Sequence, residues 1–312
     1  MIKFMDKVDY IKTILYLKLN LFRSADILIT TRCSTGCRFC IYKGIPKKDM
    51  PFKTIEKGLS LYKKLNIKKI RISGGEPFEA YDKLFYIVKK ILKFWHPKNI
   101  YLITSGNWAI EKEKIEQMLN PLIEMGLKNF IISIDAFHLE KINTRNILML
   151  LDYFKKRGIK VRINVRYNNR IKKHIKFFHL IKNNYNIAFS TFRVARVGGA
   201  ASLSEKETNI DMKKLLEFRK IFDKQSKLRD IIKMILGSCL YLTLFPNGDL
   251  HFCCVKRENT KICNINTDNF YMCLQAINNC CLDNIYRSML VHSNLHYEIC
   301  EFCPICTKNK TI

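Results

Sequence analysis

The sequence has no apolar run that approaches the roughly 18 residues needed to span a membrane. The N-terminal stretch 1–10 interleaves Lys3, Asp6 and Lys7 with apolar side chains, so it lacks the apolar block of a signal peptide. We therefore expect a cytoplasmic protein. In a reducing compartment, the 13 cysteines of the chain indicate metal binding or redox chemistry rather than disulfide bonds.

Acidic residues are also scarce. Only 27 Asp and Glu oppose 55 Lys and Arg, which gives a formal net charge of +28. A charge of this sign is typical of nucleic-acid-binding proteins. Lysines, however, are spread along nearly every expected helix, and there is no RNA-binding motif or dense basic tract with interleaved aromatics. We therefore do not expect nucleic acid as the partner.

Composition and periodicity instead predict a globular α/β protein. Hydrophobic residues make up 48% of the 312-residue chain, enough for a large core. Expected strands alternate with expected helices, and such alternation predicts parallel strands joined by right-handed crossovers in an open, partial (β/α)6 barrel. The strands are expected at 25–30, 69–73, 100–104, 129–134, 160–165 and 187–194, and the helices at 52–65, 81–95, 111–125, 143–157 and 170–183.

The first expected strand is followed by three cysteines with the spacing C-x3-C-x2-C, namely Cys33, Cys37 and Cys40. A loop this short can turn three thiolates toward one point, and soft thiolates select zinc, copper(I) or an iron–sulfur cluster. A structural zinc site usually takes four protein ligands, but the next histidines, His96 and His138, lie far along the chain. Three ligands on a four-iron cluster would leave one iron open to a substrate or cofactor.

This motif, with the aromatic Phe39 before its last cysteine, resembles the signature of the radical S-adenosylmethionine (SAM) superfamily. A second motif, Ile-Ser-Gly-Gly-Glu-Pro at 72–77, ends the next expected strand and resembles the GGEP motif of that family. The two motifs are one βα unit apart, as in the family. The resemblance implies a radical SAM (β/α)6 core, which we place at residues 25–202.

The resemblance also implies a mechanism. Cys33, Cys37 and Cys40 would hold a [4Fe–4S] cluster whose open iron is chelated by SAM, and one electron from the reduced cluster would cleave SAM to methionine and a 5′-deoxyadenosyl radical. Polar or small residues at the carboxyl ends of the strands would contact SAM, with Glu76 accepting from its ammonium group. We expect these cofactor-binding residues to be Phe39, Ser73, Gly74, Gly75, Glu76, Ser133, Asp135 and Arg166.

Some of these residues have simpler interpretations. The Gly-Gly-Glu-Pro segment could be only a turn, and Ser133 or Asp135 could cap the helix that follows. His138 could transfer a proton or contact SAM, but a histidine at a helix start is more often structural. We therefore leave His138 out of the expected site.

Beyond the core, we expect an N-terminal extension at 1–24, helical or extended, a helical linker at 203–235 and a cysteine-rich domain at 236–312. This tail holds ten of the 13 cysteines. A strand at 240–245, a turn at 246–249 and the pair Cys239 and Cys253 resemble the opening of the SPASM and Twitch domains. Those domains follow the barrel in many radical SAM enzymes and carry auxiliary [4Fe–4S] clusters.

The auxiliary cluster would be held by Cys239, Cys253, Cys303 and Cys306, with Cys300 as an alternative ligand. A full SPASM tail continues C-x2-C-x5-C-x3-C, whereas this chain has C-x2-C-x2-C at 300–306, so we expect one auxiliary cluster rather than two. Cys254 could donate a hydrogen atom to a substrate radical. The remaining thiols could be small buried hydrophobes, ligands of a second cluster or part of a zinc ribbon; they are Cys263, Cys273, Cys280 and Cys281.

By resemblance, the substrate would be a peptide or protein that is crosslinked, epimerised or oxidised, and a reductant such as flavodoxin or ferredoxin would supply the electron. The alternatives are a radical SAM enzyme that acts on a small molecule or on RNA, and a non-catalytic zinc-binding module. The sequence does not indicate the oligomeric state.

Overall fold

The computed structural model describes residues 24–167, 169–185, 187–193, 202–204, 241–252 and 261–277. None of the helices in these ranges is long and apolar enough to cross a membrane. Residues 1–23 of the N-terminal extension, residues 205–235 of the helical linker and most tail cysteines lie outside the described residues, so the predictions made for them stay predictions. These cysteines are Cys239, Cys253, Cys254, Cys280, Cys281, Cys300, Cys303 and Cys306.

Two compact units make up the chain. The first contains residues 1–28, 50–70 and 229–312, and the second contains residues 29–49 and 71–228. The domain boundaries expected from the sequence fall in or beside undescribed segments. They therefore remain predictions.

A parallel sheet forms the centre of the second unit. Strands β3, β4, β5 and β6 pair in parallel in their order along the chain, and β2 lies next to β3. The sheet ends at β6 and does not close on itself, as a partial barrel requires. The strands are β2 (Lys69–Ser73), β3 (Ile100–Thr104), β4 (Phe130–Ser133), β5 (Val161–Tyr167) and β6 (Ala188–Arg193).

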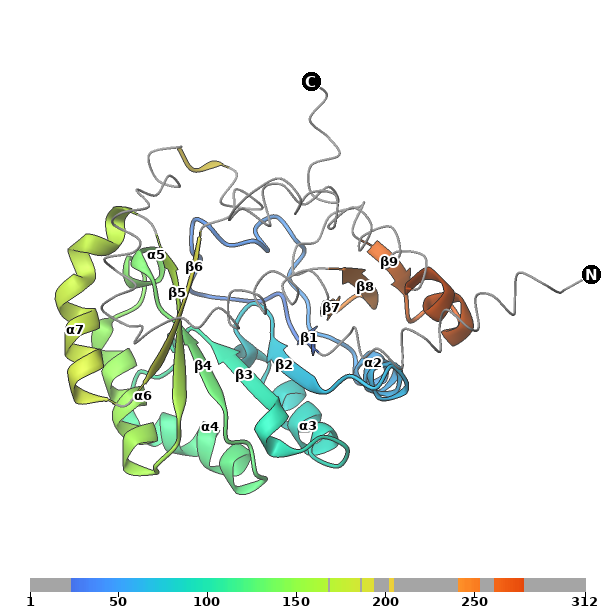
Figure 1. Ribbon diagram of the computed structural model, residues 1–312, viewed down its shortest axis with the longest axis horizontal. Coiled ribbons are helices and arrows are strands. Elements are labelled where there is room, and N and C mark those ends of the chain that lie inside the picture. Colours follow the sequence, from blue (N-terminus) through green and yellow to red (C-terminus); the bar gives the residue numbers. More distant parts are fainter. Residues whose placement is uncertain are drawn as a thin grey trace, which may run out of the picture. The chain divides into compact units, whose positions relative to one another are not determined.

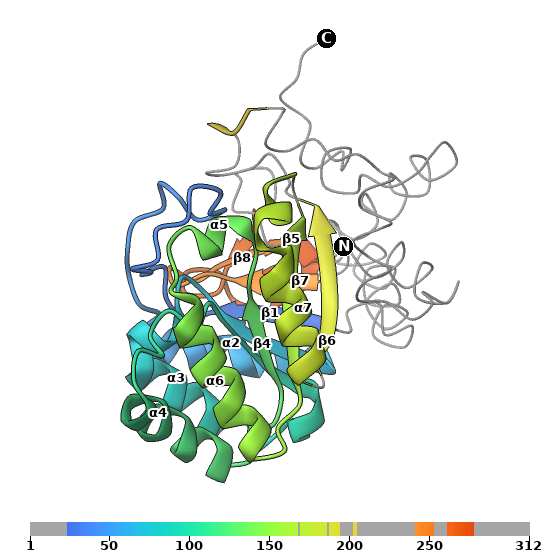
Figure 2. The ribbon, with the colours of Figure 1, turned by 90° about the vertical axis from the view of Figure 1, so that its left-hand side faces the viewer.

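Helices α3, α4, α6 and α7 lie along one side of these strands, as seen in two perpendicular views (Figures 1 and 2). In α6 the residues Ile147, Leu151 and Phe154 recur at helical spacing and are buried, so one face of the helix covers the sheet. The helices are α3 (Tyr81–Ile91), α4 (Lys112–Glu124), α5 (Ala136–Leu139), α6 (Thr144–Lys156) and α7 (Ile175–Asn184), with 3-10 turns η1 (Pro77–Ala80), η2 (Pro97–Asn99) and η3 (Asn169–His174).

In the first unit, β1 (Ser24–Leu28) pairs in parallel with β7 (Tyr241–Leu244). Strand β7 continues into the antiparallel strands β8 (Asp249–Phe252) and β9 (Lys261–Asn264). Helix α2 (Phe52–Lys64) packs against β7, because a Cβ at its Gly58 would overlap the side chain of Leu244.

The expected α/β fold with a parallel sheet is confirmed. The six expected strands are present in the expected order, and so are the strand before the turn at 246–249 and the strand that returns from it. Three details differ from the expectation. The helix expected at 170–183 begins as η3, α3 ends at Ile91, and the short elements α5 and β9 were not expected.

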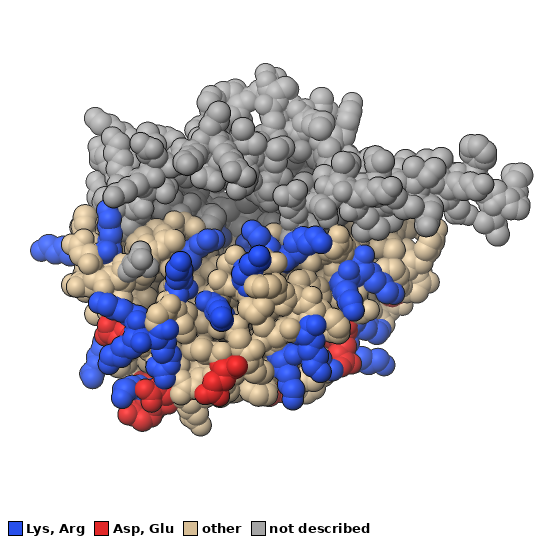
Figure 3. Space-filling view, turned by 60° about the horizontal axis from the view of Figure 1, so that its bottom comes forward, with Lys and Arg blue, Asp and Glu red and all other residues tan. Residues whose placement is uncertain are grey.

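Basic side chains are spread over the visible surface instead of forming one cluster. On the face shown in Figure 3, Lys and Arg residues are separated by uncharged residues, with a few acidic groups among them. Several basic residues of the described helices occupy the last helical turn, for example Lys63 in α2, Lys90 in α3 and Lys155 in α6. A cation there interacts favourably with the helix dipole, which gives a structural reason for part of the net charge.

Candidate active site

The three cysteines of the first motif lie in the segment 31–49 of the second unit, which follows β1 in the sequence. This segment is pinned near its two ends, where Thr31 N donates to Lys48 O at 2.9 Å and Thr30 forms an antiparallel bridge with Asp49. Between these ends, Cys40 N donates to Cys37 O at 3.2 Å, which folds the loop back on itself. The local hydrogen bonds therefore hold the thiols in one compact loop.

Cys33, Cys37 and Cys40 are all half-buried free thiols. Burial raises the pKa of Cys33 and Cys40, and electrostatic repulsion from Cys33 and Cys37 adds to the increase at Cys40. The three thiols are thus near enough to influence one another. Their three sulfur atoms do not form one of the groups of described residues in which all ligand atoms lie within 4.8 Å of one another.

Three thiolates from one loop suit an iron–sulfur cluster as ligands. A single ion draws all its ligand atoms together, whereas a [4Fe–4S] cluster bonds each thiolate to a different iron. Three thiols in one loop that do not all converge within 4.8 Å match the ligands of a [4Fe–4S] cluster. The residues present therefore fit the cluster that the motif implies.

Arg32 ties the cysteine loop to the segment that follows β2. Its guanidinium binds Asp49 through two contacts, Nε to Oδ1 at 2.8 Å and Nη2 to Oδ2 at 2.7 Å, and also donates to the carbonyl of Glu79. Ser34 N donates to Glu79 Oε1 at 2.6 Å. These contacts fix the backbone on both sides of Cys33.

The Gly-Gly-Glu segment runs directly beside the cysteine loop. Ile29 N donates to Ser73 O at 3.0 Å, and Gly75 N donates to Thr30 O at 2.7 Å. A Cβ at Gly74 would overlap the carbonyl oxygen of Thr30, and one at Gly75 would overlap that of Arg32. The expected reason for the glycines was the close approach of SAM, but the structure adds an internal reason, which is the close approach of the cysteine loop itself.

Glu76 is buried at the end of this segment, with 1% of its surface exposed. Its Oε1 accepts from Thr104 Oγ1 at 2.8 Å and from Phe78 N at 3.3 Å, and its Oε2 accepts from Ser105 Oγ at 2.6 Å and Ser105 N at 2.8 Å. Burial raises the pKa of Glu76 although these donors oppose the increase. The carboxylate thus joins the ends of β2 and β3, and its role as an acceptor for the SAM ammonium stays a prediction.

Thr104 and Ser105, which were not among the expected site residues, lie at the carboxyl end of β3. Besides binding Glu76, Ser105 Oγ lies 3.4 Å from Thr35 Oγ1 in the cysteine loop. Thr104 Oγ1 accepts from Trp108 Nε1 at 2.9 Å, and the Trp108 ring stacks on Phe78 at 3.8 Å. One polar network therefore connects the cysteine loop, Glu76 and β3.

Phe39 packs into a small apolar cluster next to the thiols. Its ring stacks on Phe137 with the centroids 4.8 Å apart, and Leu203 and the half-buried Cys37 complete the cluster. The edge of His138 meets the Phe39 ring at 5.2 Å. The aromatic position of the motif therefore shields one side of Cys37, while its predicted contact with SAM is untested.

The buried Asp135, which precedes α5, and the half-buried His138 of α5 form a close pair. Asp135 Oδ1 accepts from the backbone N–H groups of Phe137 and His138 at 3.0 Å, so this residue does cap the short helix, the simpler role considered for it. Its Oδ2 lies 2.9 Å from His138 Nδ1, within ion-pair distance but outside hydrogen-bond alignment. Burial lowers the pKa of His138, but Asp135 and Cys37 hold it well above its usual value.

Ser133 and Arg166 lie on neighbouring strands of the same sheet. Ser133 ends β4, where it is paired with Asn164 of β5, and Arg166 lies two residues further along β5. Both side chains are half-buried. The structure places them at the carboxyl ends of parallel strands, where barrel enzymes bind their substrates, and their contacts with SAM stay predictions.

Comparison with known proteins gives a family match over the region that holds these residues. Residues 27–177 match the family described as Radical SAM superfamily. GTP 3',8-cyclase of Aquifex aeolicus is 30% identical over 152 residues, which are 44% of this chain and 45% of that protein. GTP 3',8-cyclase of Staphylococcus carnosus is 32% identical over 160 residues. The match thus covers about half the length of these curated relatives.

Two solved structures resemble the fold over most of the chain. Streptococcus suis SuiB bound to S-adenosylmethionine has a TM-score of 0.62 and 16% identity, with 95% of this chain and 75% of SuiB covered. Native anSMEcpe with bound AdoMet and the Cp18Cys peptide has a TM-score of 0.56 and 16% identity, with 90% and 86% covered. At such low identity, these likenesses show the fold alone.

Proposed function

Because residues 27–177 of this chain match the radical SAM superfamily, we propose that the chain cleaves SAM reductively and uses the resulting 5′-deoxyadenosyl radical to abstract a hydrogen atom from a peptide or protein. The observation that carries the proposal is the position of three free thiols in one loop fixed against Gly74 and Gly75. When bound, the [4Fe–4S] cluster would supply the electron for this cleavage.

The residues of the chain hold and shape the site. Cys33, Cys37 and Cys40 would ligate the cluster, and the contacts of Arg32 with Asp49 keep the loop in place without any cofactor. Phe39 and its apolar neighbours exclude water beside Cys37. Exclusion of water is what a site needs if a reactive radical is to meet its substrate instead of solvent.

A peptide substrate is supported by likeness in fold. SuiB has been solved with its precursor peptide SuiA, and that structure covers 98% of this chain with a TM-score of 0.62. The crosslinks, epimerisations and oxidations expected of such an enzyme all start with abstraction of a hydrogen atom. Within this proposal, an auxiliary cluster bound by tail cysteines would accept an electron from the substrate or bind it, and a reductant such as flavodoxin or ferredoxin would feed the site.

A small-molecule substrate is the second candidate, because two curated relatives, which match 44% and 46% of the chain, are called GTP 3',8-cyclase. The two candidates can be separated by isotope transfer. The reduced enzyme is incubated with SAM and either a deuterated candidate peptide or deuterated GTP. Deuterium in the released 5′-deoxyadenosine identifies the substrate that lost the hydrogen, and transfer from GTP but not from peptide would overturn the peptide proposal.

SAM cleavage itself is tested with Cys37→Ala. Two remaining thiolates cannot hold the cluster, so we expect 5′-deoxyadenosine release to fall below one hundredth of the wild-type rate, measured by chromatography under strictly anaerobic conditions. Cys281→Ala removes a thiol outside the motif and serves as the control. Release of 5′-deoxyadenosine by Cys37→Ala at the wild-type rate would disprove the assignment of the cluster to Cys33, Cys37 and Cys40.

A further inference from the structure

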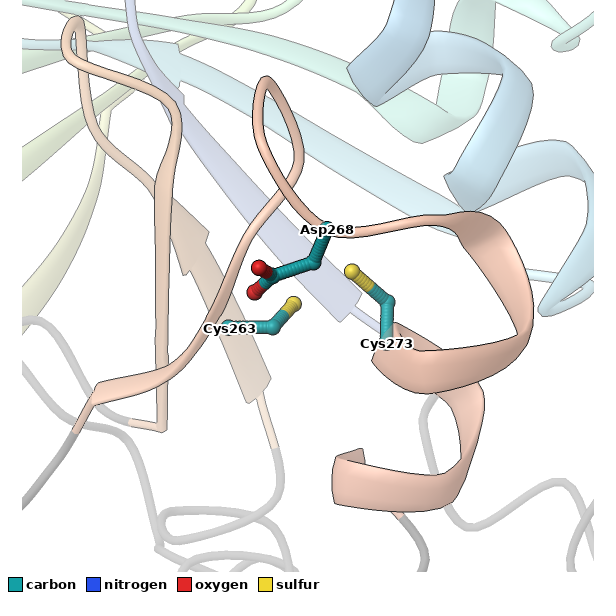
Figure 4. A group of neighbouring side chains, drawn as sticks. All are labelled: Cys263, Asp268 and Cys273. Atoms are coloured by element: carbon teal, nitrogen blue, oxygen red, sulfur yellow. The ribbon is translucent and has the colours of Figure 1, made fainter.

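A second thiol group lies in the first unit, on residues to which the proposed SAM chemistry gives no role. Cys263 of β9, Asp268 in the following turn and Cys273 in the helical segment 270–277 each point one ligand atom toward the others (Figure 4). The three atoms lie within 4.8 Å of one another. Within the described ranges, no other three His, Cys, Asp or Glu residues converge as closely.

Both thiols are buried, with 5% of Cys263 and 2% of Cys273 exposed, and they are close enough for each to influence the pKa of the other. Two buried cysteines could simply fill space as small hydrophobes. The half-buried carboxylate of Asp268 accepts from Asn264 N, but one of its oxygens also lies within 4.8 Å of both sulfur atoms, where apolar packing gives it no role. A group of this kind is stabilised when a cation binds among its members.

The backbone around the three residues is fixed by its own hydrogen bonds. Asn264 N donates to Asp268 Oδ2 at 2.7 Å, and Asp268 N donates back to Asn264 O at 2.8 Å. Asn269 caps the helical segment, since its Oδ1 accepts from Met272 N at 2.8 Å, and its carbonyl accepts from Cys273 N at 3.1 Å. Such supporting contacts orient ligands before a metal arrives.

The geometry points to a site for one divalent metal ion of the zinc type, which we propose is held by Cys263, Asp268 and Cys273. Soft thiolates favour such ions over magnesium or calcium. A tetrahedral zinc with Zn–S bonds of about 2.3 Å sets its sulfur atoms roughly 3.8 Å apart, so the observed group needs only a small closure. Water would complete the tetrahedron, and two thiol protons would be released on binding.

This site differs from an iron–sulfur cluster site. A [4Fe–4S] cluster takes cysteine ligands spread over several irons, as the wider spacing of Cys33, Cys37 and Cys40 allows, whereas this group has two thiols at single-ion distance. None of its members is an expected ligand of the auxiliary cluster. The bound ion would tie β9 to the helical segment after it.

The test measures zinc in the full-length chain after anaerobic iron reconstitution, so that cluster thiols are already occupied. One equivalent of ZnCl2 is added, unbound metal is removed, and zinc and iron are counted by mass spectrometry. The wild type should retain about one zinc per chain, as a single ligand set of this kind implies. Cys263→Ser with Cys273→Ser should lose it, with iron content and 5′-deoxyadenosine release unchanged.

Since substitution of two buried residues can impair folding, Asp268→Asn provides an independent test. This change leaves both thiols in place and should weaken zinc binding by about tenfold or more, whereas Asp82→Asn, the same change at an exposed aspartate, should not. Zinc should also raise the melting temperature of the wild type and a chelator should lower it.

Three results would overturn the proposal. They are a wild type that retains no zinc, zinc affinity unchanged by Asp268→Asn, and a disulfide between the two cysteines, seen as a mass about 2 Da lower, that excludes the metal. Each is distinguishable from failure of the proposed SAM chemistry, because 5′-deoxyadenosine release is measured on the same samples.

Discussion

At the scale of single residues, Glu76 has the most tightly defined environment of the candidate site. Its two oxygens are acceptors for four hydrogen bonds in a buried position. A carboxylate suits this position because all the surrounding groups can donate. An amide of the same shape would turn one acceptor into a donor that faces other donors.

Glu76→Gln should therefore lower the free energy of unfolding by roughly 1–3 kcal/mol, the cost of buried hydrogen-bonding groups left unpaired. The measurement is urea denaturation of the wild type and the variant. Glu113→Gln makes the same change on the exposed surface of α4 and should leave stability nearly unchanged. Equal stability of all three proteins would show that the Glu76 network does not hold the ends of β2 and β3 together.

The ion pair of Arg32 with Asp49 predicts a pH dependence. Burial raises the pKa of Asp49, but hydrogen bonds from Arg32 and Thr30 outweigh it and leave the pKa below its model-compound value of 3.8. A carboxyl with a depressed folded-state pKa stabilises the fold above its unfolded-state pKa and loses that contribution as the pH falls through the folded-state value.

Stability measured from pH 6 to pH 3 should therefore fall less steeply in Asp49→Asn than in the wild type below about pH 4.5, the range in which this carboxyl begins to bind a proton in the unfolded state. The Asp49→Asn variant should also be less stable at pH 6. Glu113→Gln, at an exposed glutamate of α4, should follow the wild-type curve. Parallel curves for Asp49→Asn and the wild type would contradict the role assigned to the pair.

The sequence could identify single residues only where a motif marks them. Cys33, Cys37 and Cys40 were predicted from their spacing, but the network of Glu76 with Thr104 and Ser105 joins positions 28 and 29 residues apart, which lie at or beyond the ends of two different strands. Local patterns do not contain such contacts. The i,i+3 spacing of Asp135 and His138 was a usable signal for the buried pair, because such residues share a face once a helix starts there.

At the scale of elements, the segment after β2 shows why two adjacent glycines are needed. Gly74 has a φ of +150°, and at both positions a side chain would collide with the backbone of the cysteine loop. The end of β2 and the cysteine loop therefore lie in direct backbone contact. The cysteine loop should respond to any atom added between them.

Gly75→Ala should force the loop away from β2 and cut iron uptake by more than half, with a stability loss of about 1–3 kcal/mol typical of overpacking. Iron per chain after reconstitution and urea denaturation are the two readouts. Gly158→Ala is the control for a glycine replaced without crowding. Its φ of +63° makes the substitution strain the backbone, but the space around Gly158 is open, so an added Cβ displaces no neighbour. Full iron uptake by Gly75→Ala would mean that the contact does not position the loop.

Element positions were predictable where long periodic patterns exist and poorly so elsewhere. The six strands and the main helices agree with their expected positions because alternation and helical periodicity extend over many residues. The four-residue helix α5 depends on a single cap by Asp135, and β9 exists only because β8 offers it an edge. Such short elements are decided by tertiary contacts that periodicity does not report.

At the scale of the whole molecule, the first unit joins segments from opposite ends of the sequence. The parallel pairing of Ser24 in β1 with Tyr241 in β7 makes the tail part of the same unit as the first strand of the chain. No local pattern could predict this, because a strand's sequence does not specify a distant partner. The pairing holds β7 against β1 within the first unit.

The central claim, SAM cleavage at the three-thiol loop, is tested most directly by one measurement on the wild-type chain. After anaerobic reconstitution and reduction, iron, sulfide and 5′-deoxyadenosine are quantified in the same sample. The account predicts 5′-deoxyadenosine release with about eight irons per chain, or four for each [4Fe–4S] cluster. Release with about four irons would retain the central claim and remove the auxiliary cluster, whereas bound zinc without iron or 5′-deoxyadenosine would contradict the account.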